Sequence, residues 1–143
     1  MLLQTLSNRA GVSGNEGPIR KLLIPAVKDY VDELTVDTMG NVYAVKHGTG
    51  DSPLTVMVTA HMDEVGFMIT KITAGGLLKF ETVGAIDPRI LPGQTVRVGP
   101  KKLPGVIGAK ALHNLSDAER TAAPTAGGLA IDIGAAGKEA AEA

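Results

Sequence analysis

The sequence predicts an α/β protein whose frame is interrupted by a small β-rich module. Three observations favour this fold class. Apolar residues recur at helical spacing over 19–34, and the almost uninterrupted apolar run 54–60 is typical of a strand covered on both faces. After Gly66 the pattern changes to short strands separated by turns, in a chain with 18 Gly and 8 Pro. We therefore expect three parts: 1–65 as the first part of an α/β domain, 66–126 as an inserted β-rich module, and 127–143 as a return into the α/β domain.

Composition excludes several classes of protein. The 143 residues carry 14 Lys and Arg against 15 Asp and Glu, a net charge of −1, which argues against nucleic acid or an anionic membrane surface as a partner. The absence of Cys excludes a disulfide scaffold, a thiolate metal site and a Cys nucleophile. No run approaches the roughly 20 apolar residues of a membrane span, and residues 1–8 lack the features of a secretory signal, so a cytoplasmic location is expected. With no Trp and four Phe and Tyr in total, the core should be aliphatic.

The first 65 residues should hold two helices, a strand pair and a buried strand. A short helix opens the chain and stops near Gly11. Ser13 to Glu16 then offers an S-x-x-E capping pattern ahead of the long amphipathic helix, with Asn15 and Gly17 as other possible caps. Pro25 should kink this helix. Strands over 34–37 and 42–46 follow, and the strand 54–60 leads directly into His61-Met62-Asp63-Glu64. Open α/β sheets place their ligands at such carboxyl ends of strands.

The rest of the chain reads as strands and short helices. Strands are expected over 67–73 and 77–83 with the turn Ala74-Gly75-Gly76 between them, over 95–98 and 106–109 with Gly-Pro and Pro-Gly pairs as separators, and over 129–133. Ser116 should cap a short helix over 117–121. Residues 138–143 begin a helix with no stop signal, which suggests a fragment of a longer chain.

The candidate chemistry lies in His61-x-Asp63. Residues i and i+2 of a strand share a face, so His61 could bind a divalent metal through one ring nitrogen while Asp63 accepts a hydrogen bond from the other. The alternative is a His and an Asp at a strand end that merely meet solvent. The residues alone leave both interpretations open.

Six motifs occur in one order along the chain and together carry a resemblance. They are Gly11-Val12-Ser13-Gly14-x-Glu16, Asp37-x-x-Gly40-Asn41, Ala60-His61-Met62-Asp63-Glu64-Val65-Gly66-Phe67, Gly84-x-Ile86-Asp87-Pro88-Arg89, Pro104-Gly105-Val106-Ile107-Gly108-x-Lys110-x-x-His113 and Ile131-Asp132-Ile133-Gly134-Ala135. The ordered set resembles the amino-terminal part of the glutamyl-aminopeptidase family of co-catalytic metallopeptidases, which includes the tetrahedral self-compartmentalising aminopeptidases.

The resemblance implies a partial catalytic α/β domain with an inserted, barrel-like dimerisation domain. It implies two divalent metals, zinc or cobalt, whose activated water attacks the peptide bond next to a free amino terminus. His61 would be one metal ligand, and Asp63 would belong to the catalytic set as the carboxylate that orients it. Peptide substrates and homo-oligomers from dimers to dodecamers are implied as partners.

The family's remaining metal ligands and its general base come later in the chain than this sequence extends. A catalytic zinc takes about three protein ligands, so the chain alone should be inactive. His47 is expected in a solvated loop, His113 in a structural or interface role, and Glu64 as an exposed charge. Asp87 and Arg89 should form an ion pair that fixes a turn, and Asp132 should face solvent.

Two hypotheses from other classes stand beside the aminopeptidase. The first is a catalytically incompetent module whose β-rich insert mediates self-association. The second is a glycoside hydrolase, which needs two facing carboxylic acids and usually aromatic sugar platforms. The scarcity of aromatic residues argues against the second.

Overall fold

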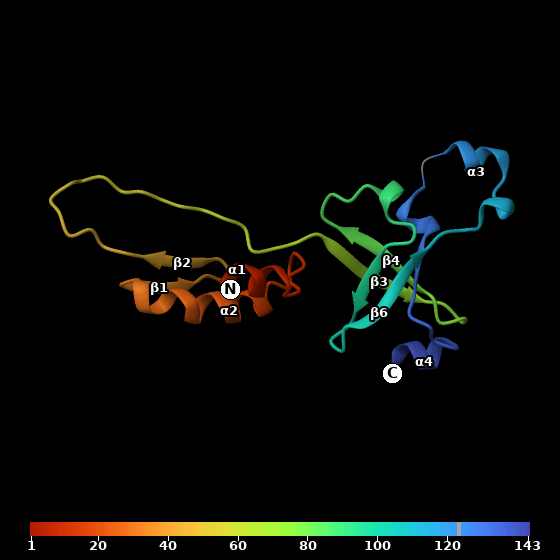
Figure 1. The fold of residues 1–143 in the computed structure, drawn as a ribbon, viewed down its shortest axis with the longest axis horizontal. Coiled ribbons are helices and arrows are strands. Elements are labelled where there is room, and N and C mark those ends of the chain that lie inside the picture. Colours follow the sequence, from red (N-terminus) through yellow and green to blue (C-terminus); the bar gives the residue numbers. More distant parts are fainter. Residues whose placement is uncertain (123) are drawn as a thin grey trace. The chain divides into compact units, whose positions relative to one another are not determined.

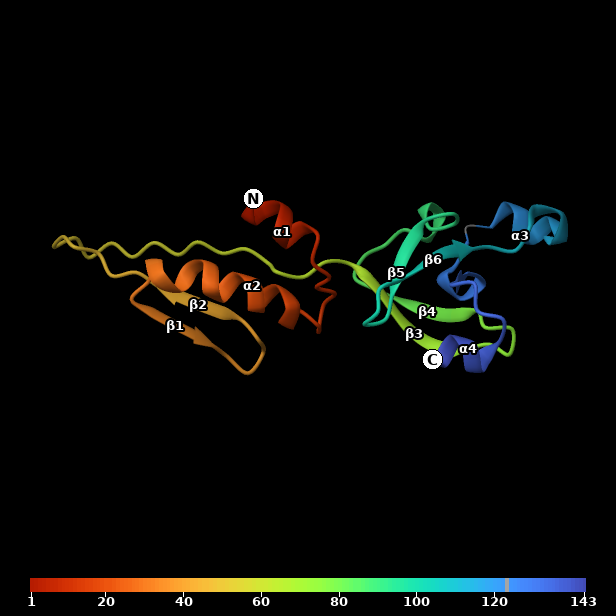
Figure 2. The ribbon, with the colours of Figure 1, turned by 60° about the horizontal axis from the view of Figure 1, so that its bottom comes forward.

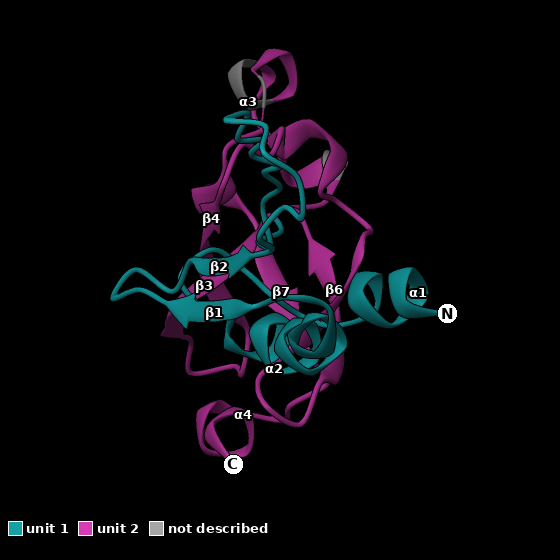
Figure 3. Ribbon diagram, turned by 90° about the vertical axis from the view of Figure 1, so that its left-hand side faces the viewer, with its two compact units in different colours: residues 1–64 teal, residues 65–143 magenta. Residues whose placement is uncertain are grey.

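The computed structural model describes residues 1–122 and 124–143 and shows a mixed α/β protein with a curled β-sheet. The chain divides into two compact units, Met1–Glu64 and Val65–Ala143 (Figure 3). No helix of the described residues is long and apolar enough to cross a bilayer.

The first unit holds two helices and one hairpin. Helix α1 spans Leu2–Ser7 and α2 spans Gly17–Val27, followed by the 3₁₀ turn η1 at Lys28–Tyr30. Strands β1 (Glu33–Val36) and β2 (Val42–Val45) pair antiparallel, with Leu34 opposite Ala44. Helix α2 lies beside this hairpin in both ribbon views (Figures 1 and 2). The predicted opening helix and strand pair are confirmed.

The long helix is shorter than its apolar pattern predicted. It ends at Val27, and Val31 already has an extended backbone with φ −124°. Leu34 fits the helical spacing in sequence but lies in β1. The predicted capping role of Ser13 is wrong as well. The residue at the helix N-cap is Glu16, and no side chain caps the helix. The Ser13 hydroxyl instead donates a hydrogen bond to Asp63.

The predicted buried strand 54–60 is also wrong. These residues lie in no strand, and Leu54 and Val58 are 77% and 90% exposed. The segment after β2 is drawn as a long unpaired ribbon in Figure 1. A strand covered on both faces needs neighbouring strands to pair with its backbone and layers to cover its side chains. No described strand pairs with this segment, so its apolar sequence alone does not produce the expected element.

The second unit is built around one five-stranded antiparallel sheet in the order β3-β4-β7-β6-β5. Its strands are β3 (Gly66–Ile72), β4 (Leu78–Val83), β5 (Thr95–Val98), β6 (Leu103–Gly108) and β7 (Ala130–Asp132). The β3–β4 hairpin and the strand at 95–98 are confirmed. Strand β6 begins earlier than expected, because Pro104 and Gly105 lie inside it opposite Arg97 and Val96.

Short helical segments complete the second unit. They are η2 (Pro88–Ile90), η3 (Leu112–Asn114), α3 (Asp117–Thr121), η4 (Ala126–Gly128) and α4 (Lys138–Glu142). The predicted helix at 117–121 and the helical start after residue 138 are confirmed. Ala141 of α4 packs against the hydrophobic core, so this five-residue helix is held by tertiary contact and not by its own length.

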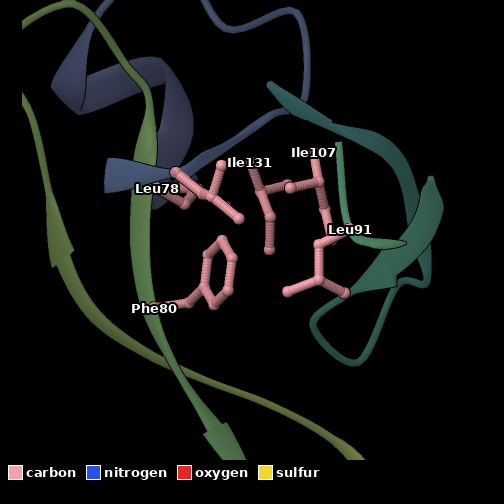
Figure 4. Close-up of a cluster of buried hydrophobic side chains, with 6 residues drawn as sticks. Leu78, Phe80, Leu91, Ile107 and Ile131 are labelled. Atoms are coloured by element: carbon pink, nitrogen blue, oxygen red, sulfur yellow. The ribbon is translucent and has the colours of Figure 1, made fainter. Parts of the chain in front are cut away.

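The core of the second unit is mostly aliphatic, as expected. Its buried members are Leu78, Phe80, Leu91, Ile107, Leu129 and Ile131. Figure 4 shows that β4, β6 and β7 contribute side chains to one cluster, which Leu91 joins from the loop before β5. Phe67 packs edge-on against Phe80 with a ring-centroid distance of 4.9 Å. Asp132 is exposed beside buried Ile131, which confirms its predicted solvent-facing position.

Candidate functional site

The candidate site is a small depression in the first unit. Its cavity volume is about 150 Å³, and three segments line it: the start of α2, the turn between β1 and β2, and the residues just before Glu64. The polar side chains among the lining residues belong to Glu16, Arg20, Asn41, His61 and Asp63. Both predicted site residues therefore lie in this depression.

His61 and Asp63 contact each other without the strand that was expected to align them. His61 Nδ1 lies 3.1 Å from Asp63 Oδ1 and 3.0 Å from the Asp63 carbonyl oxygen. Two oxygen acceptors at Nδ1 favour the tautomer with its proton there, which leaves the Nε2 lone pair available. The imidazole is 85% exposed, so Nε2 is open to a ligand from solvent. This is the arrangement in which a carboxylate fixes the tautomer of a metal-binding His.

The second oxygen of Asp63 is held by Ser13. Ser13 Oγ donates to Asp63 Oδ2 across 2.5 Å, and this hydrogen bond is the largest cause that lowers the pKa of the Asp63 carboxyl. Burial, the second-largest cause, raises this pKa, whereas a backbone N–H and His61 lower it further. Asp63 is therefore a carboxylate at neutral pH, which is the state that accepts from an imidazole N–H.

Glu64 joins the same loop to the residues before α2. Its carboxylate accepts from the Gly11 backbone N–H at 2.9 Å, and its own N–H donates to the Gly11 carbonyl oxygen at 2.9 Å. A parallel bridge between Val12 and Glu64 completes the junction. The prediction that Glu64 is an exposed charge is confirmed, but its hydrogen bonds to Gly11 were not foreseen.

Arg20 connects two walls of the depression. Its Nη1 lies 3.6 Å from Glu16 Oε2 and donates to the Gly40 carbonyl oxygen at 3.3 Å. Glu16 accepts from the Gly14 N–H at 2.6 Å, and this bond is the main cause that lowers the pKa of the Glu16 carboxyl. Arg20 thereby holds the β1–β2 turn against the start of α2.

That turn is shaped by Asp37 and Asn41. Asp37 accepts from the Asn41 backbone N–H and from Asn41 Nδ2, each at 2.8 Å, and from the Tyr43 hydroxyl at 3.3 Å. The Asn41 side chain is the largest cause that lowers the pKa of Asp37. Gly40 has φ +90°, a backbone conformation that favours glycine. The D-x-x-G-N motif thus builds a turn at the edge of the depression.

The sequence interpretation missed Ser13, Arg20 and Asn41 as members of the site. Ser13 and Asn41 belong to the six ordered motifs, but Ser13 was expected only as a helix cap and Asn41 was assigned no side-chain role. Arg20 belongs to none of the six ordered motifs, and its role depends on the approach of Gly40, twenty residues away along the chain.

The other two histidines lie elsewhere. His47 is exposed, and its Nε2 lies 3.0 Å from Glu33 Oε1, so it meets a carboxylate partner that the sequence had not indicated. His113 lies in η3 of the second unit. Among residues 1–122 and 124–143, no group of three or more His, Asp and Glu is placed to hold a metal ion.

Comparison with known proteins decides the family. The model of the M42 glutamyl aminopeptidase family matches residues 40–143. The chain belongs to this family. Lysyl aminopeptidase of Pyrococcus furiosus is 35% identical over 99% of the chain and 41% of its own length. The resemblance stated from the ordered motifs is therefore confirmed.

Solved structures agree with this family assignment. The crystal structure of a TET aminopeptidase from a marine-sediment thaumarchaeon matches 99% of the M42 chain with a TM-score of 0.87 and 35% identity, over 40% of its own length. The Pyrococcus horikoshii TET1 peptidase, which can assemble into a tetrahedron or a large octahedral shell, matches with a TM-score of 0.79 and 38% identity over 99% of the chain and 42% of its own length. A protein of Thermotoga maritima described as an endoglucanase matches 98% of the chain, and 40% of its own, with a TM-score of 0.81 and 41% identity. The M42 chain thus spans about 40% of the length of the proteins it matches.

Proposed function

We propose that this M42 chain is the amino-terminal part of a metal-dependent aminopeptidase, with His61 as one metal ligand and Asp63 as the carboxylate that orients it. The observation that carries the proposal is the His61 ring, with Nδ1 against Asp63 and Nε2 open to solvent, in a member of an aminopeptidase family. The substrates would be peptides with a free amino terminus. Two divalent metals per site, zinc or cobalt, are part of the proposal.

The donor chemistry of the chain fits part of such a site. Imidazole nitrogen suits zinc and cobalt, and an outer carboxylate on the second ring nitrogen is the usual support of such a ligand. Because a catalytic zinc takes about three protein ligands, the described residues hold too few to complete it. We infer that residues corresponding to the remaining length of the relatives supply the others, and that the 143-residue chain alone is inactive.

The residues at hand have distinct roles in this proposal. A bound divalent metal would lower the pKa of a coordinated water and stabilise negative charge on the attacked carbonyl. His61 would offer the Nε2 lone pair for it. Asp63 keeps the proton on Nδ1 and makes the imidazole a better donor. The Asp63 carboxylate must be ionised for this, and the direction of its pKa shift supports that state at neutral pH.

The oligomeric assembly forms a second part of the proposal. The relatives include a peptidase that can assemble into a tetrahedron or a large octahedral shell, which supports a homo-oligomer for the complete protein. We propose that residues 66–126 are an inserted dimerisation domain, that 127–143 lead back into the catalytic domain begun by 1–65, and that the protein acts in the cytoplasm. The alternative function is a catalytically incompetent module whose β-rich residues 66–126 only mediate self-association. The similarity to the assembling TET1 peptidase supports this alternative as well.

A chimaera tests the proposed chemistry. Residues 1–143 replace the corresponding segment of the P. horikoshii TET1 peptidase, and hydrolysis of aminoacyl-p-nitroanilides is measured with zinc or cobalt. We expect turnover by the chimaera and none by the 143-residue chain. His61→Ala should reduce kcat/KM by more than the roughly 10–100-fold typical of an outer-shell change, and Asp63→Asn should fall within that range. His47→Ala is the matched control and should change kcat/KM by less than about twofold, because His47 does not line the depression.

A second measurement covers a chimaera that fails to fold. Cobalt is titrated into the 143-residue chain, and paramagnetic broadening of the His61 and His47 ring signals is followed by NMR. We expect His61 to broaden at the lower cobalt concentration. Equal broadening of the two rings, or an active His61→Ala chimaera, would overturn the assignment of His61 as a metal ligand.

A further inference from the structure

Asp63 is held from two sides by groups that lie far apart in sequence. Its Oδ1 faces His61 Nδ1 at 3.1 Å, whereas its Oδ2 accepts from Ser13 Oγ at 2.5 Å. Ser13 is partly buried and lies 50 residues before Asp63. The two contacts use different oxygens of one carboxylate, so the hydrogen bond from Ser13 constrains the direction in which Oδ1 can face His61.

We propose that Ser13 is a positioning residue, whose hydroxyl fixes the plane of the Asp63 carboxylate and thereby the ring orientation and tautomer of His61. A terminal carboxylate torsion is broad, so a carboxylate held at one oxygen alone samples many orientations. A hydrogen bond to a charged carboxylate is strong enough to select among them. The proposal rests on the function proposed above for its consequence in catalysis, but its structural content concerns only residues of this chain.

The loop that carries Ser13 is itself fixed at both ends, which a positioning role requires. On one side, the two hydrogen bonds between Gly11 and Glu64 hold the loop against the residue next to Asp63. Gly11 is buried, and a Cβ there would lie 2.5 Å from Ile19 Cγ1, so only glycine lets the backbone pass this close to α2. On the other side, the Gly14 N–H donates to Glu16 at the start of α2.

The loop therefore fixes Asp63 relative to the start of α2. Gly14 has φ +84°, so its conformation also favours glycine. The hydrogen bonds of Gly11 to Glu64 and of Gly14 to Glu16 hold the backbone on either side of Ser13, whose hydroxyl donates to Oδ2 of Asp63. This gives the Gly-Val-Ser-Gly-x-Glu motif a physical role: it holds the carboxylate that holds the imidazole.

The first test uses NMR of the 143-residue chain without metal. Long-range ¹H–¹⁵N spectra of the His61 ring are recorded at pH 8 for the wild type, Ser13→Ala, Ser13→Thr and Ser52→Ala. We expect the Nδ1–H tautomer to dominate in the wild type, a shift toward mixed tautomers in Ser13→Ala, and recovery in Ser13→Thr, which restores a hydroxyl. Ser52→Ala removes a hydroxyl that accepts from the nearby Leu54 N–H and should leave the His61 ring unchanged.

Backbone signals show whether the loop stays folded. The Gly11 and Gly14 amide shifts should be retained in Ser13→Ala, since their partners are Glu64 and Glu16. If these shifts are lost in Ser13→Ala, the comparison of wild type with Ser13→Thr still decides. An unchanged His61 tautomer in Ser13→Ala, or a failure of Ser13→Thr to restore it, overturns the proposal.

The second test separates this proposal from the proposed function. In the chimaera, Ser13→Ala should lower kcat by roughly 10–100-fold with little change in KM, the range expected of an outer-shell partner. A tautomer shift combined with an active His61→Ala chimaera would refute the metal-ligand role and leave the positioning role of Ser13 intact. An inactive His61→Ala chimaera combined with an unchanged His61 tautomer in Ser13→Ala would refute the positioning role of Ser13 and leave the metal-ligand role of His61 intact.

Discussion

An apolar cluster is buried in the second unit of this chain, whereas an apolar run in the first unit is exposed. In the second unit, β4 and β7 place Leu78, Phe80 and Ile131 in the interior, each no more than 2% exposed. In the first unit, the more continuous apolar run 54–60 lies in no strand and is exposed. An apolar segment favours burial, but it becomes a buried strand only where neighbouring strands pair with its backbone.

The largest effect should come from the buried side of this comparison. Phe80→Ala removes a ring that packs against Phe67 and leaves a cavity among aliphatic side chains, so the free energy of unfolding should fall by about 3–5 kcal/mol. Urea denaturation followed by circular dichroism measures it. Met68→Ala on β3, a strand of the same hairpin, is the control. Since Met68 is exposed, its replacement should cost no more than about 0.5 kcal/mol. Equal losses would show that the second unit has no localised core.

A smaller effect is expected at the β3–β4 turn, where two adjacent glycines differ. Gly76 has φ +85°, and a Cβ there would lie 2.7 Å from the Ala135 carbonyl oxygen, so Gly76→Ala should cost about 1–3 kcal/mol. At Gly75 a Cβ meets open space, and Gly75→Ala should be neutral or stabilise by up to about 1 kcal/mol. The same urea titration compares them. Loss of stability in Gly75→Ala alone would contradict the turn geometry.

The pH dependence of the Asp87–Arg89 pair should be a weaker effect. Arg89 donates side-chain and backbone hydrogen bonds to Asp87 and lowers the pKa of its carboxyl from 3.8 to about 2. Because this pKa is lower in the folded state, the contribution of the pair is present above pH 3.8 and is lost as the pH falls toward 2. Carboxyl ¹³C NMR titration should place the Asp87 midpoint near 2 and, in Arg89→Gln, move it back toward 3.8. An unmoved midpoint in Arg89→Gln would exclude Arg89 as the cause. Both groups are solvent-exposed, so little change in stability at pH 7 is expected.

The smallest effect on stability should come from the exposed run. Val58→Lys should change the free energy of unfolding by no more than about 0.5 kcal/mol, since Val58 is 90% exposed. The same change should weaken concentration-dependent association in sedimentation velocity. Unpaired backbone N–H and C=O groups in a segment with apolar side chains are a template for pairing with another chain. Ile90→Lys, an exposed apolar residue in η2, is the control and should leave association unchanged. A marked loss of stability in Val58→Lys would mean that the run packs in the isolated chain after all.

The comparison also explains which parts of the candidate site could be predicted. His61 and Asp63 are two residues apart, and their contact forms within the segment that carries them even though the predicted strand is absent. Arg20 and Gly40 could not be paired in advance, because nothing in either segment indicates the distance between α2 and the β1–β2 turn. The misplaced end of α2 has the same origin: Leu34 satisfies a helical period, but pairing with Ala44 places it in a strand.

By itself, the sequence determined the elements whose signals are local: the β1–β2 and β3–β4 hairpins, the helix at 117–121, the Asp87–Arg89 pair and, through six ordered motifs, the family. Only the tertiary structure decided that Ser13 holds Asp63 and that residues 54–60 lie exposed. The physical reason is that a turn or an i,i+2 contact is complete within a few residues. A buried strand, or a carboxylate held from 50 residues away, depends on what the fold brings beside it.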